Sequence, residues 1–512
     1  MPDNSASNKR IARNSIYMTI RMIVVLAITF YTTRVILDKL GVIDYGVYNV
    51  VCGFVTMFGF LNTSMSNGIQ RFFNYELGKN GIQATNNVFN TALLIQLILG
   101  IIIILLTETI GLWYLHSKMV IPEGRLIAAE WIFQFSIISF LLVMMQAPFS
   151  AAVMAHEKMD FYAVVNVLDA ILKLVIVLIL PWFDYDRLII YGGLFASISL
   201  INLALYYFYC RVNFKELRVI IHFDKSLFRS MLSFSGWNIF GSLSGVMKEQ
   251  GINLVMNFFF GPVVNAARGV ANQVNGGLQS FVRNITIPVR PQVIQSFAEG
   301  NFNRTINLTY SISKLSCYFI IMLSIPIVLN LDVILNIWLK NNIPDHAANF
   351  IIIVLGLSII SNLNAAISGV VHASGDMKKY QTISSIFEIA AVPIAYFTMK
   401  LYPVPEVALL IVLIAAATAH ASCLFILSGI VPFSVSDYCR KVVIPLCILL
   451  GLSVCVCVPI HNMAANSIVG VVTDCFVSAI ISSSVMYLFV LNKKEKAFVL
   501  SVVKIVKHRF IK

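Results

Sequence analysis

The stretch GPVVNAARGVANQVNGGLQSFVRNITIPVRPQ, residues 261–292, is a polar segment in an otherwise largely apolar chain. It is long enough for a membrane-crossing helix, yet it carries Arg268, Gln273, Gln279 and Arg283 among asparagines and glycines. Such side chains are tolerated at membrane depth only where they face protein or a water-filled cavity. The stretch therefore predicts a polar helix in the interior of a membrane protein.

The composition of the whole chain supports this interpretation. Of 512 residues, 58% are hydrophobic and 12% are charged, which is typical of a polytopic membrane protein. The first apolar run has no small-residue cleavage site after it, so we expect it to be retained as a helix. Apolar runs of bilayer length predict an all-α protein with fourteen transmembrane helices, near 14–37, 42–65, 85–108, 127–149, 161–181, 188–210, 231–258, 263–288, 305–330, 347–371, 380–400, 405–430, 441–460 and 468–491.

The distribution of positive charge predicts the topology. With the N-terminus inside, the cytoplasmic segments hold most of the 37 Lys and Arg residues. The opposite loops hold only Lys39, Lys118, Arg125, Arg187, Lys340 and Lys400. This bias follows the positive-inside rule and predicts that both termini are cytoplasmic. The positive net charge is therefore explained by topology, and we expect no nucleic-acid partner.

An internal repeat predicts the domain organisation. A shift of 220 residues places GVIDYGVYNVV, from Gly41, against GPVVNAARGVA, from Gly261. Six helices per half make this a parallel pseudo-two-fold repeat of two six-helix lobes. We expect an N-lobe at 1–210, a basic cytoplasmic linker at 211–229, a C-lobe at 230–430 and two extra helices at 431–491. The remaining residues, 492–512, have the amphipathic, basic pattern of a helix that lies on the inner leaflet.

The N-terminal pattern NSIYMTIRMIVVLAITFYTTRVILDKLGVIDYGVYNVV, residues 14–51, combines an arginine in a long helix with a short outer turn and the run LGVIDYGVYNVV. With the helix number and the polar eighth helix, it resembles the bacterial polysaccharide flippases. Their superfamily also contains the multidrug and toxin exporters and the lipid II flippase. The resemblance implies that an undecaprenyl-pyrophosphate-linked oligosaccharide repeat unit of O-antigen, capsule or exopolysaccharide crosses the bacterial inner membrane by alternating access. It also implies partners among membrane lipids and polysaccharide assembly proteins.

Five cations fall inside the predicted spans, namely Arg21, Lys173, Lys248, Arg268 and Lys314. Each costs roughly 2.5 to 3.5 kcal/mol on insertion scales unless it has a partner or an aqueous cavity. Asp169 lies four residues before Lys173 on the same helical face, so we expect a structural pair. Lys314 lies near the cytoplasmic end of its helix, where it could snorkel to the interface, so we expect it to be structural too.

The other three cations, with Arg34, are candidates for a substrate site. Arg21, Lys248 and Arg268 lie on helices one, seven and eight, at repeat-related positions of both lobes, where parallel-repeat transporters build their sites. Guanidinium and ammonium groups suit a pyrophosphate. We expect these three side chains to face one solvent-accessible cavity. The alternative is that each forms a salt bridge between the lobes.

Amides and acids leave further alternatives open. Gln273 and Asn275 could bind sugar hydroxyls, or hydrogen-bond between closely packed helices. The acids could bind a coupling ion, but a role as partners of the cations is favoured. These acids are Glu249, Asp169, Glu388 and Asp474.

Catalytic and metal-binding patterns are missing from the sequence. There is no P-loop, HExxH or supported GxSxG motif, and the nine cysteines form no CxxC pair. We therefore expect neither an enzyme nor a metal or cofactor. Two alternatives to the flippase remain: a cation-coupled multidrug exporter of the same superfamily, and, less favoured, an integral membrane enzyme of envelope polysaccharide synthesis.

Overall fold

The computed structural model describes most of the chain between residues 4 and 496. The description leaves out residues 63–64, 67, 70–71, 74–84, 157, 216, 220–223, 287–292, 294–295, 298, 341, 375–377, 464–467 and 493–494. Side chains are not described at 4–19, 233–242, 284–286, 372–373, 378, 463 and 468. Most of the amphipathic tail expected at 492–512 therefore lies outside the described residues.

The described residues form helices joined by short turns. In chain order the helices are α1 (Asn4–Thr56), α3 (Thr85–Leu106), α4 (Leu112–Ser117), α5 (Leu126–Ala155), α6 (Met159–Ile179), α7 (Arg187–Asn213), α8 (Lys225–Phe260), α9 (Pro262–Thr286), α11 (Phe302–Leu329), α12 (Leu331–Leu339), α13 (Ala347–Ser374), α14 (Lys378–Leu401), α15 (Pro405–Ser428), α16 (Val435–Tyr438), α17 (Ile444–Met463) and α18 (Ile468–Val485). Single π-helical turns join α3 to α4 and α16 to α17.

Among the described residues, eleven helical segments are long and apolar enough to cross a membrane. The first of them, Ile20–Thr56, covers most of the expected first and second helices, which are separated by a break at Gly41. The polar helices α8 and α9 occupy the expected seventh and eighth positions without belonging to the eleven. The prediction of an all-α multi-pass membrane protein is confirmed, and every expected segment has a helical counterpart.

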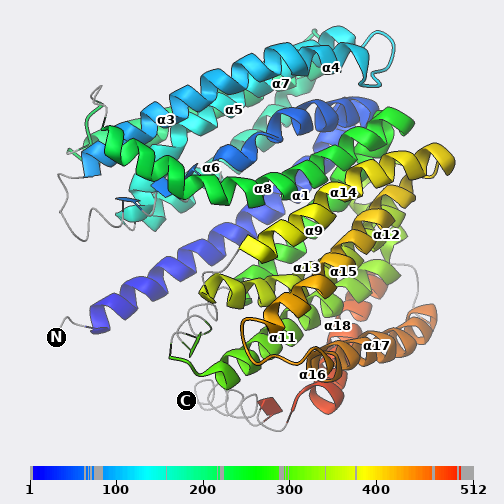
Figure 1. Cartoon of the computed structure of the whole chain (residues 1–512). Helices are drawn as coiled ribbons and strands as arrows, with labels where there is room; N and C mark the ends of the chain where they lie inside the picture. Colours follow the sequence, from blue (N-terminus) through cyan, green and yellow to red (C-terminus); the bar gives the residue numbers. More distant parts are fainter. Residues whose placement is uncertain are drawn as a thin grey trace. The chain divides into compact units, whose positions relative to one another are not determined.

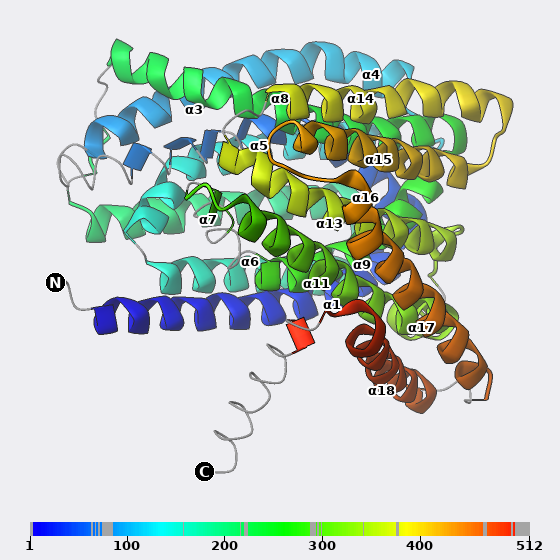
Figure 2. The ribbon, with the colours of Figure 1, turned by 60° about the horizontal axis from the view of Figure 1, so that its bottom comes forward.

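The chain divides into two compact units. Unit 1 comprises Met1–Val270, Trp338–Ala347 and Glu388–Ala408, and unit 2 comprises the remaining residues. Within unit 1, α5 and α7 run side by side and α6 packs against α1 (Figure 1). Within unit 2, α17 and α18 lie side by side and both contact α11 (Figure 2).

Two glycines interrupt the helices at repeat-related positions. Gly41 breaks α1 with φ 83° and ψ 168°, and Gly261 separates α8 from α9 with φ 75° and ψ −170°. This region of backbone space is accessible essentially only to glycine. The two positions that the 220-residue shift aligns therefore adopt nearly the same unusual conformation.

The segments that follow these two breaks pack closely within unit 1. A Cβ atom on Gly46 would lie 2.0 Å from the carbonyl oxygen of Pro262, and one on Gly269 would lie 3.1 Å from the Asn49 side chain. Asn49 and Gly269 are themselves repeat-related. Only glycine permits the approach at Gly46, because any side chain there would overlap backbone atoms.

Asparagines join α8 to α9. Asn265 Nδ2 donates to Asn253 Oδ1 at 2.7 Å and to the Asn253 carbonyl at 2.8 Å, and Asn257 Nδ2 donates to Asn265 Oδ1 at 3.1 Å. Asn257 Oδ1 also accepts a bond of 2.9 Å from the Val120 N–H. The two polar helices thus satisfy much of each other's hydrogen-bonding capacity, which explains how they are accommodated at membrane depth.

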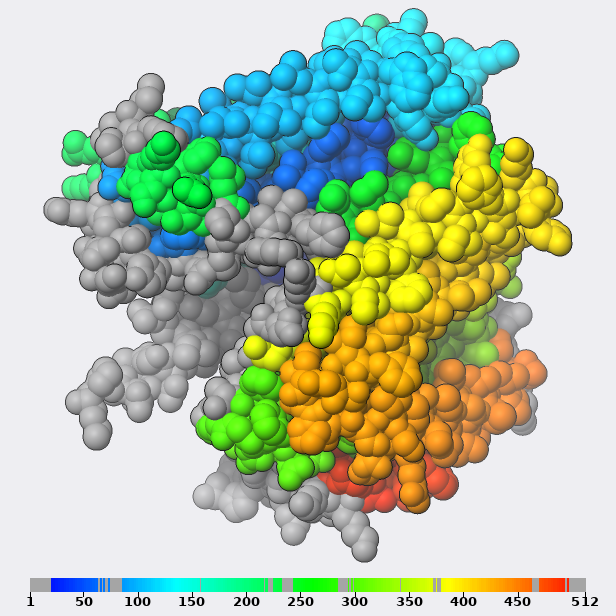
Figure 3. Space-filling view, in the orientation of Figure 1, coloured from blue at the N-terminus to red at the C-terminus, as the bar shows by residue number. Residues whose placement is uncertain are grey.

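Large apolar and aromatic side chains cover the surface of unit 1. Figure 3 shows the surface of α3 and α4 in light blue, where exposed apolar side chains include Leu97, Ile101 and Leu105. Exposed aromatic side chains gather near the helix ends that the charge bias predicts to be outside, at Trp113, Trp131, Trp182, Tyr185 and Tyr402. Such a belt is typical of a membrane–water interface.

Candidate functional site

Two of the predicted substrate-binding cations form ion pairs. Arg268, on α9, donates to Glu249 Oε1 of α8 at 2.7 Å, and Lys248, on α8, donates to Glu388 Oε1 of α14 at 3.1 Å. Lys248 and Glu249 are neighbours but point to different partners, as their separation of about 100° around the helix requires. All four residues belong to unit 1, and both pairs join helices of the second half of the sequence.

The Arg268–Glu249 pair is unequally buried. The Arg268 side chain is 6% exposed, whereas that of Glu249 is 45% exposed. Arg268 Nε is buried and has no hydrogen-bond partner among the described residues. The Arg268 guanidinium is therefore buried, and its carboxylate partner lies on the accessible side of the pair.

Arg21 has a different environment. Its guanidinium carbon lies 5.4 Å from the centre of the Tyr162 ring of α6, which is a cation–π arrangement. Arg21 Nε is buried and has no hydrogen-bond partner within the described part of the chain. Arg34, one turn after Phe30, likewise makes no ion pair with any described carboxylate. Trp338 packs against this part of α1, because its indole N–H donates to the Phe30 carbonyl at 2.7 Å.

The predicted Lys173–Asp169 pair is present on α6. Lys173 Nζ lies 2.7 Å from Asp169 Oδ2, and Asn202 of α7 donates to Asp169 Oδ1 at 2.7 Å. Lys173 Nζ also lies 5.1 Å from the centre of the Phe195 ring. Phe195 contacts Tyr48, the residue that corresponds to Arg268 in the repeat. The first half of the chain thus has an aromatic cluster where the second half has an ion pair.

The candidate amides lie in unit 2, on the C-terminal part of α9. Asn275 Oδ1 accepts a short hydrogen bond from Ser358 of α13, and Gln279 accepts one of 3.3 Å from Asn362, one turn further along both helices. Gln273 is partly exposed and makes no hydrogen bond to a described residue. Asn275 therefore joins helices, as one of the two interpretations expected, while the Gln273 amide remains accessible.

Asp474 and Lys314, both in unit 2, are buried with partners. Asp474 Oδ2 lies 2.6 Å from His461 Nδ1 and accepts from Asn330 Nδ2 at 2.9 Å. Lys314 has the structural role expected of it, through an ion pair. Its side chain is 5% exposed and pairs with Glu495, which the sequence offered no local reason to choose.

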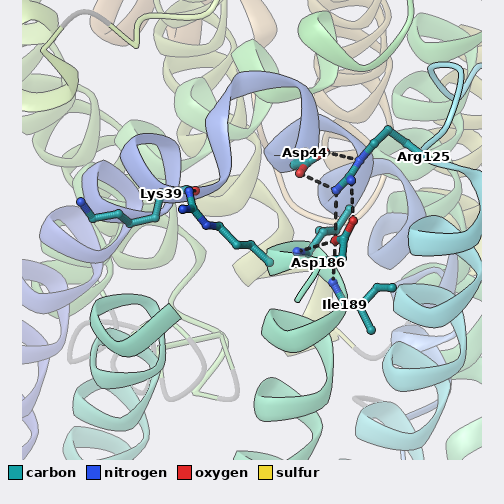
Figure 4. Close-up of polar contacts among 7 residues, drawn as sticks. Lys39, Asp44, Arg125, Asp186 and Ile189 are labelled. Carbon is teal, nitrogen blue, oxygen red and sulfur yellow. Dashed lines mark hydrogen bonds and ion pairs between the residues drawn. The ribbon is translucent and has the colours of Figure 1, made fainter. Parts of the chain in front are cut away.

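A charge cluster that the sequence did not reveal joins three segments of unit 1 (Figure 4). Arg125 donates to Asp44 of α1 at 2.8 and 2.5 Å and to Asp186 at 2.5 and 3.2 Å. Asp186 in turn caps α7 by accepting from the N–H groups of Leu188 and Ile189. Burial alone would raise the pKa of Asp186, but the hydrogen bond and charge of Arg125 lower it below its ordinary value.

The second half carries a related pair. His346 precedes α13 as Arg125 precedes α5, and its Nδ1 lies 2.7 Å from Glu406 Oε1 at the start of α15. His346 and Glu406 lie about 220 residues after Arg125 and Asp186. This spacing was the signal by which the sequence could have revealed the two contacts. The His346–Glu406 contact lies at positions that the 220-residue shift aligns with the Arg125 cluster, and we interpret both as structural.

Comparisons with known proteins identify the fold. Neither a protein-family model nor a curated protein matches the chain. Among solved structures, the lipid II flippase MurJ in an inward closed conformation matches with a TM-score of 0.65 and 14% identity, over 93% of this chain and 99% of that one. An inward-facing multidrug resistance MATE transporter of the MOP superfamily matches with a TM-score of 0.65 and 12% identity, over 80% of this chain and 98% of the other.

A third match is a MOP superfamily transporter from Pyrococcus furiosus, with a TM-score of 0.55 and 12% identity, over 81% of this chain and 95% of that one. That transporter is described as having a binding pocket of reversed polarity, which suggests a different function for it. These neighbours are transporters or flippases rather than enzymes. At this level of identity they show that the chain has the fold of MOP superfamily transporters.

Proposed function

We propose that this protein is a flippase that moves an undecaprenyl-pyrophosphate-linked oligosaccharide repeat unit across the bacterial inner membrane. The observation that carries the proposal is the pair of arginines in α1 that have no carboxylate partner among the described residues. They occur in a fold shared with a lipid II flippase. Arg21 and Arg34 lie in a membrane-crossing helix, and neither forms an ion pair with a carboxylate among the described residues. Arginines without a carboxylate partner in such a helix favour an anionic ligand, and a pyrophosphate offers the oxygens that a guanidinium binds bidentately.

The two ion pairs supply a second element of the proposal. Arg268 is fixed by burial, while Glu249 is accessible. An incoming pyrophosphate would compete with Glu249 for the guanidinium, and Glu388 would keep Lys248 neutralised until substrate arrives. Charge would then be compensated both with and without substrate, as a low-dielectric interior requires.

The proposed cycle assigns parts of the sequence to moving bodies. The lobes are residues 1–210 and 230–430, connected by the basic linker 211–229, with 431–491 as extra helices and both termini in the cytoplasm. Alternating access of these lobes would carry the polar head group across while the polyprenyl chain stays in the lipid. Other proteins of polysaccharide assembly would supply the repeat unit and remove it.

Gene deletion tests the proposal. In the organism that carries this gene, deletion should cause lipid-linked repeat units to accumulate on the cytoplasmic leaflet, and the wild-type gene should reverse the accumulation. Arg21→Gln should fail to reverse it, because the amide retains hydrogen-bonding groups but loses the charge. Accumulation is measured by mass spectrometry of extracted polyprenyl-linked sugars.

Arg304→Gln is the matched control, since Arg304 is an exposed arginine near the start of α11. It should behave as wild type. If deletion causes no accumulation, the flippase assignment fails. If Arg21→Gln complements as well as Arg304→Gln at equal protein level, the assignment of the pyrophosphate to Arg21 fails.

A cation-coupled multidrug exporter is the second candidate. It is favoured by the equal TM-score of the MATE transporter and by the half-exposed carboxylate of Glu249, which could bind a cation. In that case, cells that lack the protein should retain cationic dyes, and Glu249→Gln should be as defective as the deletion. Unchanged dye retention would exclude this candidate.

A further inference from the structure

Helix α6 has two faces of opposite character. Tyr162, Asn166, Asp169 and Lys173 follow one another at spacings of four, three and four residues and therefore share a face. The exposed apolar side chains of α6 lie on the other side of the helix, since Ile171 is about 200° from Lys173 at about 100° per residue. These are Val164, Ile171, Val175 and Leu178, which are 64%, 41%, 42% and 46% exposed. The lipid-facing side of α6 is therefore the apolar one.

The polar face is accessible even though it points away from lipid. The Lys173 and Asp169 side chains are 37% and 27% exposed, and Asp169 is the central residue of the helix Met159–Ile179. The two groups compensate each other's charge, but the part of each side chain that remains exposed on the side opposite the lipid must face water or a polar ligand. The polar face of α6 therefore borders a hydrated space.

The chemistry of this face suits a neutral, hydroxyl-rich ligand. Lys173 and Asp169 neutralise each other, so the pair does not select for an anion. Lys173 uses one of its three N–H donors on Asp169, and Asn166 uses its Nδ2 on the Tyr162 carbonyl at 2.7 Å, which leaves its Oδ1 as an acceptor. Asn202, which is 9% exposed, has a buried Oδ1 with no partner among the described residues. The Phe195 ring adds an apolar surface beside these groups.

Arg21 lies at the other end of the same face. Its guanidinium stacks on Tyr162, eleven residues before Lys173, which corresponds to about 16 Å along a helix. Two kinds of group thus lie in line along α6. One is Arg21, a cation without a carboxylate partner among the described residues, and the other is the neutral Lys173–Asp169 pair. A pyrophosphate-linked sugar has the same order of an anionic and a neutral part.

We propose that Asn166, Asp169 and Lys173 of α6, with Asn202 and Phe195 of α7, form a saccharide-binding site that holds the sugar while its pyrophosphate contacts Arg21. This inference rests on the proposed function, and it assigns the neutral saccharide of the substrate to the polar face of α6. Ion pairing between Lys173 and Asp169 then keeps both groups oriented for hydroxyl groups.

Cysteine labelling of the purified full-length protein in nanodiscs tests the hydrated face without any substrate. Cysteines introduced as Asn166→Cys and Lys173→Cys should react with a charged, water-soluble maleimide about ten-fold or more faster than those introduced as Val164→Cys and Val175→Cys, because a thiolate forms in water and not in hydrocarbon. Peptide mass spectrometry reads each site separately from the native cysteines. Equal rates on the two faces would overturn the inference and leave the proposed function standing.

Protection by ligand tests the sugar assignment. The probes are bare undecaprenyl diphosphate and the lipid-linked saccharide purified from the deletion strain. The saccharide-bearing lipid should slow the labelling of Asn166→Cys, which leaves the Lys173–Asp169 pair intact, several-fold, and the bare lipid should not. Equal protection by the two lipids would place the pyrophosphate, and not the saccharide, at this face of α6. Protection by neither lipid would exclude a ligand site there. Either result overturns the proposal. Absence of any accumulating saccharide would instead end the proposed function.

Discussion

Lys314 is buried in α11 and depends on a carboxylate close to the C-terminus. Its Nζ lies 2.5 Å from Glu495 Oε2, and Ser311 donates to the other carboxylate oxygen at 2.8 Å. Glu495 also forms a capping box with Asn492, in which each side chain accepts from the other's backbone N–H at 2.9 Å. One carboxylate therefore both neutralises a buried ammonium group and begins the helical turn that leads into the basic tail.

Replacing this carboxylate should destabilise the protein strongly. Glu495→Gln leaves the Lys314 ammonium buried and unpaired, which costs about 3–5 kcal/mol. The matched control is Asp437→Asn, which breaks the exposed pair with Lys441, where both side chains are more than half exposed, and should cost about 0.2–1 kcal/mol. Thermal unfolding in one detergent compares the two variants. Similar losses would contradict the importance of burial at Lys314.

The same pair predicts a dependence on pH. Burial alone would raise the pKa of Glu495, but its hydrogen bond to Lys314 and its other contacts lower the pKa below the ordinary value of 4.5. A lowered folded pKa means that the stabilisation is complete above about pH 4.5 and is lost as the pH falls through the folded value. Wild type should therefore lose more stability than Glu495→Gln over that acidic range.

Residue spacing predicted some of these partners and not others. The Lys173–Asp169 pair follows from a separation of four residues on one helix. Lys248 and Glu388 are 140 residues apart in the sequence, so their pairing depends on how α8 and α14 pack. Sequence reasoning therefore established that the intramembrane cations need compensation, but only the structure gives the compensating group for Arg268, Lys248 and Lys314.

Helix breaks are the element-scale feature most directly encoded in the chain. Gly41 and Gly261 hold backbone angles that other residues rarely adopt, so alanine at either position should cost about 1–3 kcal/mol. No atom lies within 4 Å of a Cβ built on Gly41, so there the cost is conformational rather than steric. The measurement is thermal unfolding of Gly41→Ala and Gly261→Ala.

Gly276→Ala is the control for both substitutions. Gly276 lies within α9, and a methyl group added there would have no described atom within 4 Å, so alanine should raise stability by about 0.5–1 kcal/mol. If Gly41→Ala were as stable as this control, the break in α1 would not be imposed by the glycine. The sequence predicted both breaks, because each glycine lies between two segments that are long enough to cross the bilayer as helices.

Topology is the prediction that belongs to the whole molecule. Alkaline phosphatase fused after Gly124, in the turn between α4 and α5, should be active because that turn is expected outside. A fusion after Gly300, in the turn before α11, should be inactive. Both glycines have positive φ in loop turns, which makes them comparable fusion sites. The reverse pattern of activities would invert the orientation that the Lys and Arg bias predicts.

The all-α membrane fold could be predicted because apolar runs of bilayer length are a property of the sequence alone. The candidate site could be predicted only in part, since its residue types were recognisable but their partners were not. The Arg125 cluster shows the reason. Asp44, Arg125 and Asp186 lie in three separate segments, and no local spacing links them, so their convergence is a product of helix packing.

The hydrogen bonds among Asn253, Asn257 and Asn265, which join α8 to α9, also bear on how the two helices enter the membrane. Neither helix belongs to the segments apolar enough to enter the bilayer by composition, yet each supplies amides that the other needs. An isolated polar helix would leave those groups facing lipid during synthesis, at a cost of several kcal/mol. We therefore expect α8 and α9 to enter the bilayer together, as a hairpin that turns at Gly261.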